Sequence, residues 1–232
     1  KLRCARYFCW DIPTVTASTA TGSTTIIAGT DVDQTAGSSA GLTVTAGGEI
    51  NLTSTGTGAQ TFTGGEDIDI ETNTTTGDVT VVGGATVAGG VAGIDVEATA
   101  STGTVNVSGA NAVDVEATAA DTVILSNAGA DDGLDVTVGN ATAATTLTVT
   151  SENAVAFTAA AAAAQTVSIT AGDDSTVNLN GSDTPDSVTL NSTDNYADDA
   201  ATFTLTANGA GNDDITALVL SGSDDIIVSA AD

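Results

Sequence analysis

The sequence predicts an all-β protein, folded as a right-handed parallel β-helix (a β-solenoid) with about two strands per roughly 20-residue repeat. Three observations support this prediction. Apolar and polar residues alternate in short runs, clusters of Gly, Asn, Asp and Ser separate the runs, and one acidic strand motif returns along the chain. No helical period competes with the alternation.

The short runs place apolar residues at every second position, as in Ile68/Ile70 and Val167/Ile169. A period of two buries one face of a strand and leaves Thr, Asp, Asn and Ser on the other. The runs recur about every ten or eleven residues, with turn-forming clusters such as Ala46-Gly47-Gly48 between them. This spacing alone fits either a β-sandwich pair or a solenoid.

Internal repetition favours the solenoid. The segment Ile68-Asp69-Ile70-Glu71 returns as Ile94-Asp95-Val96-Glu97 and Val113-Asp114-Val115-Glu116, and in weakened form as Leu134-Asp135-Val136-Thr137. A second strand follows each copy, and such repeats stack as coils that bury their apolar faces on their neighbours. Paired immunoglobulin-like domains are the rival, but that fold usually centres on a buried Trp, and the only one here is Trp10.

Two regions follow from these patterns: an atypical N-terminal segment over 1–12 and a β-solenoid over 13–232. We expect projecting loops around 85–93 and 193–201, and a tight coil rather than a helical turn at 159–164. The first ten residues hold all three basic residues and both cysteines. An unrelated neighbouring segment is the simplest interpretation, and a local or intermolecular disulfide between Cys4 and Cys9 is the alternative.

The composition limits both the core and the partners. Aromatic residues make up 3% of the 232 residues and Met is absent, which suits a thin core. With 30 acidic and 3 basic residues the net charge is -27, so we expect no nucleic-acid binding, no membrane insertion, and cations as partners. Disorder is the alternative for such a charge, but regularly spaced β-branched residues favour order. No signal peptide is evident, so we expect either that an N-terminal leader has been removed or that export depends on a signal at the C-terminal end.

Stacking in register predicts an acidic face. Asp69, Asp95, Asp114 and Asp135 would form one outward row, with Glu71, Glu97 and Glu116 beside it. Carboxylates one strand spacing apart repel one another, and bound divalent cations would relieve that repulsion. We therefore take Asp95, Glu97, Asp114 and Glu116 as candidate metal ligands. A solvated face that keeps the protein soluble is the equally good alternative.

The turns near the C-terminal end carry a second candidate site. The segment Gly209-Ala210-Gly211-Asn212-Asp213-Asp214-Ile215 fits the G-x-G-x-D-x-U core of a calcium-binding nonapeptide, and partial copies begin at Gly181 and Gly222. Glycines permit a tight turn whose carbonyls face the ion, and Asp supplies the hard oxygen that Ca²⁺ prefers. The candidate ligands for Ca²⁺ here are Asp183, Asp186, Asn212, Asp213, Asp214, Asp224 and Asp225.

On these residues the chain resembles the repeats-in-toxin (RTX) family, and more particularly the β-helical surface-layer proteins of Caulobacter type. The nonapeptide-like part covers 181–232, while the resemblance in composition covers 13–232. Asn208 stands where the motif has its first glycine, and Asp213 and Asp224 are eleven rather than nine residues apart. The resemblance implies a secreted protein that assembles on a cell surface with calcium.

Enzymatic activity is not expected. Lysine, arginine and histidine are absent after Arg6, so the basic residues that β-helical lyases use are missing. A hydrolase with two carboxylates is formally open through pairs such as Asp131/Asp132 and Asp173/Asp174. Adjacent Asp residues in turns are, however, what turn formation by itself produces.

Thr-x-Thr triplets form a further pattern, at Thr43/Thr45, Thr61/Thr63, Thr148/Thr150 and Thr204/Thr206. Regularly stacked Thr rows on a flat face are able to order water and bind ice. The alternative is that Thr is simply a favourable outward residue in a strand, and the uneven spacing of the triplets favours it.

The sequence thus predicts an extracellular structural protein, secreted to the cell surface, that self-assembles into a calcium-stabilised surface layer or filament. Neither end has an evident polar cap, so we expect a homo-oligomer in which copies stack head to tail as a filament or lattice. A cell-surface glycan is a further candidate partner. The alternative function is a stalk or binding segment of a secreted adhesin, with a glycan or ice as ligand.

Overall fold

The computed structural model describes residues 8–9, 22–36, 41–54, 56–72, 76–83, 93–109, 112–127, 134–138, 145–151, 154–159, 165–179, 185–193, 202–207, 217–222 and 226–230. Within them the chain is all β, and every strand pairing is parallel. The prediction of a parallel β-solenoid is therefore confirmed. The predicted loops at 85–93 and 193–201 and the predicted tight coil at 159–164 lie outside the described residues, except for Gly93, Thr193 and Ala159 at their ends.

Within the described residues the strands form two sheets, and from β2 onward they alternate between them, while β1 and β2 both belong to sheet A. Sheet A has eleven strands: β1 (Phe8–Cys9), β2 (Thr24–Ala28), β4 (Gly41–Ala46), β6 (Ala59–Gly64), β8 (Val79–Gly83), β10 (Thr104–Gly109), β12 (Thr122–Asn127), β14 (Thr145–Ser151), β16 (Gln165–Ala171), β18 (Pro185–Ser192) and β20 (Leu218–Ser221). Sheet B has ten: β3 (Val32–Ala36), β5 (Ile50–Ser54), β7 (Ile68–Thr72), β9 (Ile94–Glu97), β11 (Val113–Ala117), β13 (Leu134–Val138), β15 (Val155–Ala159), β17 (Ser175–Asn178), β19 (Phe203–Ala207) and β21 (Ile226–Ala230).

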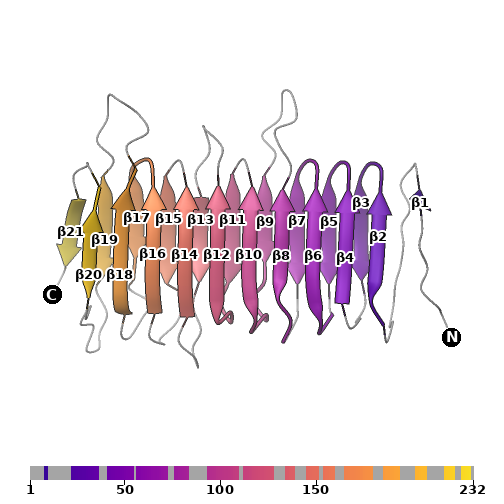
Figure 1. Cartoon of the computed structure of the whole chain (residues 1–232), viewed down its shortest axis with the longest axis horizontal. Coiled ribbons are helices and arrows are strands. Elements are labelled where there is room, and N and C mark those ends of the chain that lie inside the picture. Colours follow the sequence, from indigo (N-terminus) through magenta and orange to yellow (C-terminus); the bar gives the residue numbers. More distant parts are fainter. Residues whose placement is uncertain are drawn as a thin grey trace.

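Figure 1 shows how the coils advance. The strands of sheet A run upward in front, the chain crosses over the top to sheet B behind, and successive coils move from right to left, so the coil is right-handed. From β4 to β19, each strand pairs with the strand two places earlier and the strand two places later in the sequence. Residues far apart in the chain therefore become neighbours on adjacent strands.

The core lies between the two sheets and consists of the inward residues of each strand. Val44, Ile70 and Val107 are fully buried, and Phe62, Phe157 and Phe203 are the largest buried side chains. Polar side chains occupy the alternate, outward positions, as the burial pattern of β11 shows. The alternation that predicted the strands thus separates a thin apolar interior from two polar outer faces.

Coil length varies, and the turns absorb the variation. Hydrogen bonds between consecutive coils join residues 18, 26 and 28 positions apart in the sequence. Where the coils are short, their turns approach so closely that a Cβ atom on Gly65 would strike the carbonyl oxygen of Gly47, and one on Gly47 would strike that of Gly29. Glycine at these turns is a requirement of close backbone approach.

The N-terminal segment contributes one described strand. Phe8 and Cys9 pair in parallel with Ile27 and Ala28 at the end of sheet A. The division of the chain at residue 12 stays a prediction, and Cys4 lies outside the described residues.

Candidate cation site on the acidic face of sheet B

Two acidic rows cross the outer face of sheet B. In the first, Asp33, Asn51, Asp69, Asp95, Asp114 and Asp135 are successive partners on adjacent strands. The second row lies two positions further along each strand. Its successive partners are Thr35, Thr53, Glu71, Glu97, Glu116 and Thr137. The register that the sequence predicted for Asp95, Glu97, Asp114 and Glu116 is confirmed. We call these positions the acidic rows.

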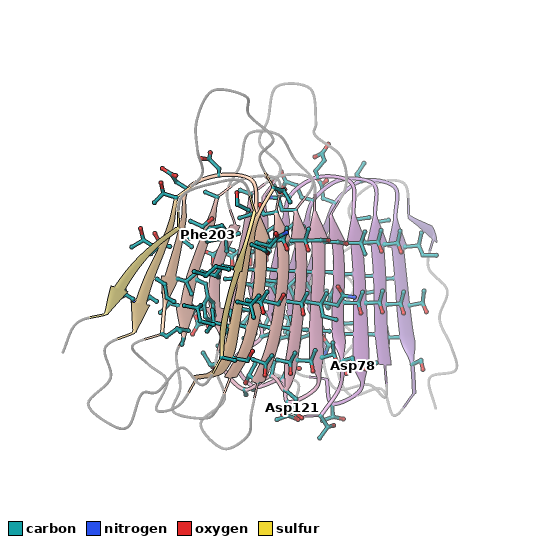
Figure 2. All side chains as sticks on the ribbon, turned by 60° about the vertical axis from the view of Figure 1, so that its left-hand side comes forward. Asp78, Asp121 and Phe203 are labelled. Atoms are coloured by element: carbon teal, nitrogen blue, oxygen red, sulfur yellow. The ribbon has the colours of Figure 1, made fainter. Side chains whose placement is uncertain are left out.

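The acidic side chains project outward because the residues between them are held inside. In β9 and β11 the Asp and Glu residues are exposed, whereas Val96, Val113 and Val115 are buried. Figure 2 shows side chains lying in straight lines across the strands. The solenoid therefore converts one short motif, repeated along the chain, into a two-dimensional array of carboxylates.

Like charges in such an array interact strongly. Adjacent strands lie about 4.8 Å apart, and two unit charges at that distance repel by about 0.9 kcal/mol in water and about 3.5 kcal/mol at an effective dielectric of 20. At Asp95, burial and a neighbouring charge act in the same direction. Partial burial raises the pKa of the Asp95 carboxyl, and the negative charge of Asp69 raises that pKa further. One hydroxyl offsets the charge at the edge of the array, since Thr53 donates to Glu71 Oε2 at 3.3 Å.

A second group of aspartates has a different role, which the sequence patterns did not predict. Four of them accept a backbone N–H from the next coil: Asp31 from Glu49 at 3.1 Å, Asp67 from Gly93 at 2.7 Å, Asp78 from Thr104 at 2.8 Å and Asp174 from Thr202 at 2.6 Å. Each of the four directly precedes a strand, and that position is the sequence signal that identifies them. We call them the turn aspartates.

The two groups differ in their role and in their place on the solenoid. The turn aspartates each use a carboxylate oxygen to hold one coil against the next, so they contribute to the stability of the stack. In the acidic rows, exposed side chains are those of Asp69, Glu71, Asp95, Glu97, Asp114 and Glu116. Among the described residues, no three Asp, Glu, Cys or His side chains come together as a metal-binding group. A cation at the rows would therefore bridge pairs of carboxylates and complete its shell with water or with oxygens of a second molecule.

The other candidate ligands do not join the acidic rows. Asp186 lies in β18, which belongs to sheet A. Asp183, Asn212, Asp213, Asp214, Asp224 and Asp225 lie outside the described residues. The nonapeptide-like calcium site thus stays a prediction, and the acidic rows are the candidate site for which the structure provides geometry.

Comparisons with protein-family models, with curated proteins and with solved structures give no match to this chain. Among the described residues, no helix is long and apolar enough to cross a membrane.

Proposed function

We propose that this protein is an extracellular structural solenoid that self-assembles into a surface layer or filament stabilised by Ca²⁺. The observation that carries the proposal is the in-register alignment of Asp69, Asp95 and Asp114 with Glu71, Glu97 and Glu116 beside them. Hard oxygen ligands in pairs suit Ca²⁺, which takes six to eight of them in flexible geometry. We assign no catalytic step to the rows.

Charge explains why a divalent ion would be coupled to assembly. At a net charge of -27, two copies that approach each other repel unless counter-ions screen or bridge them. A divalent ion between neighbouring carboxylates removes the repulsion within one copy. The same ion, when it takes oxygens from a second copy, links the two.

The exposure of the rows also favours an extracellular location. A site that offers few carboxylates on an open surface binds Ca²⁺ weakly, in the range of roughly 0.1–1 mM that is typical of extracellular modules. Calcium at cytosolic levels would leave such a site unfilled. The expected affinity of the rows thus supports the proposal of an extracellular location, where Ca²⁺ would fill them.

The end of the described solenoid is compatible with head-to-tail contact. In β20 the residues Leu218, Val219 and Leu220 are 38%, 51% and 42% exposed, although Leu218 and Leu220 align with the buried Val188 and Leu190 of β18. A further coil placed on this end would cover them and continue the parallel hydrogen bonding. A second copy that supplied that coil would make a heterologous contact, which propagates as a filament.

The proposal is tested by electron microscopy and sedimentation of the purified protein in millimolar Ca²⁺ and after chelation. We expect ordered assemblies with Ca²⁺ and their loss with the chelator. The double variant Asp95→Asn/Asp114→Asn should need roughly tenfold more Ca²⁺, because a neutral amide offers an ion neither charge nor two equivalent oxygens.

The matched control is Asp33→Asn. Asp33 lies in the same row on β3, but its partner on β5 is Asn51 rather than a carboxylate, so the same chemical change removes no acidic pair. Asp33→Asn should assemble as the unmodified protein does. Assemblies that persist unchanged in chelator, or an equal effect of the control and the double variant, would contradict the proposal.

A further inference from the structure

The outer face of sheet A differs completely from the acidic rows. Three rows of outward positions cross it. The central row is Thr25, Thr43, Thr61, Thr80, Asn106, Ile124, Thr148, Ser168, Thr189 and Val219. One flanking row is Ile27, Thr45, Thr63, Val82, Ser108, Ser126, Thr150, Thr170, Asn191 and Ser221. The other is Thr104, Thr122, Thr146, Thr166 and Ser187. We call these positions the hydroxyl face.

None of the positions of the hydroxyl face carries a charged side chain, in a chain whose net charge is -27. Within the described strands, Asp186 of β18 is the one carboxylate in sheet A, and all the others belong to sheet B. The outer face of sheet B is thus acidic from β3 to β13, whereas from β15 to β19 its outward positions are the uncharged Ala156, Thr158, Thr176, Asn178, Thr204 and Thr206. The three rows on sheet A are uncharged and dominated by Thr and Ser from β2 to β20. This length of uncharged surface, in a chain with so many carboxylates, requires an explanation of its own.

Register also resolves the uneven spacing of the Thr-x-Thr triplets. Thr43/Thr45, Thr61/Thr63 and Thr148/Thr150 belong to β4, β6 and β14 of sheet A, and only Thr204/Thr206 belongs to sheet B. Their spacing in the sequence is irregular because the coils differ in length. In space the turns absorb that difference, and the triplets lie on the same two rows. In three dimensions the triplets are therefore members of regular rows, although Asn106 and Ile124 separate those of β6 and β14 in the central row.

We propose that the hydroxyl face binds ice. Neighbours within a row are about 4.8 Å apart and rows two residues apart are about 6.6 Å apart, so the hydroxyl groups form a nearly rectangular grid. The surface of an ice crystal is likewise an uncharged, flat, periodic array of O–H donors and acceptors. Figure 1 shows the strands of sheet A aligned side by side over the length of the solenoid, which gives the grid its extent.

Threonine suits this ligand for two physical reasons. Its hydroxyl both donates and accepts hydrogen bonds, as each water molecule in ice does. Its branched Cβ restricts χ1, so the hydroxyl positions are largely fixed before binding and little entropy is lost on contact. The exposed apolar residues Ile27, Val82 and Ile124 stand singly among the hydroxyls and add no charge.

Other occupants fit the face less well. From β2 to β20 its rows contain no aromatic side chain on which a sugar ring could stack, and no cation for a nucleic acid. A second copy would find scattered methyl groups but none of the Trp, Tyr or Arg anchors that dominate protein interfaces. A rigid neutral grid of hydroxyls matches a water lattice best.

The test is inhibition of ice recrystallisation, together with the shape of single ice crystals, by the purified protein in chelator. Working without Ca²⁺ separates this proposal from calcium-dependent assembly. We expect the unmodified protein to inhibit recrystallisation and to facet the crystals. Thr148→Lys should need at least about tenfold more protein, because an ammonium at the centre of the grid keeps its own hydration shell and cannot enter the lattice.

Thr158→Lys is the matched control. Thr158 is an exposed, outward threonine of β15, so it carries the same change on the opposite face. It should retain full activity, and circular dichroism should show both variants folded. An inactive unmodified protein, or equal losses from both variants, would overturn the proposal. A third result would also overturn it: the unmodified protein shows no ice activity but forms a dimer, and Thr148→Lys dissociates that dimer. The hydroxyl face would then be a contact between copies.

Discussion

Asp95 lies directly beside Asp69 on the adjacent parallel strand of sheet B, and the charge of Asp69 adds to the effect of partial burial in raising the pKa of Asp95. The pair shows what stacking in register does to a repeated acidic motif. A single copy of the motif has no like charge close to it, but the fold brings successive copies to one strand spacing from each other. The resulting repulsion between carboxylates lowers the stability of the stack.

The first prediction concerns Asp95→Asn in the absence of divalent ions. A carboxyl whose pKa is raised by folding is destabilising when ionised, so the variant should be more stable than the unmodified protein at pH 7. For a largely exposed pair we expect a gain of about 0.2–1 kcal/mol in the free energy of unfolding. Chemical denaturation monitored by circular dichroism measures it.

The pH dependence of that gain has a definite sign. Between the ordinary pKa of aspartate and the raised pKa of Asp95, the folded state binds more protons than the unfolded state, so the contribution of this residue to stability falls as pH rises. The advantage of Asp95→Asn should be complete above the raised pKa and should vanish below the ordinary one. An advantage that grows on acidification would contradict this assignment.

The second prediction concerns a turn aspartate and has the opposite sign. Asp78 Oδ1 accepts the backbone N–H of Thr104 at 2.8 Å, and Asp78→Ala removes that acceptor. We expect the free energy of unfolding to fall by about 1–2 kcal/mol. Asp78→Asn retains an oxygen acceptor and should lose less. If Asp78→Ala were as stable as the unmodified protein, the turn aspartates would not hold the coils together.

The third prediction concerns the close approach of the short coils. Gly65→Ala places a Cβ against the carbonyl oxygen of Gly47 in the preceding coil. Because the obstacle is backbone, it cannot rotate away, and the turn must shift. We expect a loss of more than about 1 kcal/mol in stability. Gly22→Ala is the control, since a Cβ at Gly22 meets nothing within 4 Å.

The sequence predicted those features that depend on local pattern. Alternation identified the strands, and the repeated Ile-Asp-Ile-Glu motif correctly placed Asp69, Asp95 and Asp114 in one row, because identical segments in a parallel stack align. The sequence did not predict relationships that depend on the lengths of the coils. The Thr-x-Thr triplets appeared irregular because turns of different length separate them, and the hydrogen bonds of Asp31 and Asp78 join different coils. Neither relationship has a fixed spacing in the sequence.

The last prediction concerns how far a defect in the core spreads. Phe203 in β19 is fully buried and lies near the C-terminal end of the solenoid, level with Ser175 on β17 (Figure 2). Phe203→Ala should lower the free energy of unfolding of the surrounding coils by about 3–5 kcal/mol, because it removes a large side chain and leaves a cavity.

In a solenoid each coil contacts only its neighbours, so this loss should remain local. Hydrogen exchange should show reduced protection in β17, β19 and β21, with β5 and β7 unchanged. The equivalent change at the other end, Phe62→Ala in β6, should reverse the pattern and expose β4, β6 and β8. If Phe203→Ala lowered protection uniformly along the chain, the two sheets would unfold as one cooperative unit, and the coils would not be independent in the way that their nearest-neighbour contacts imply.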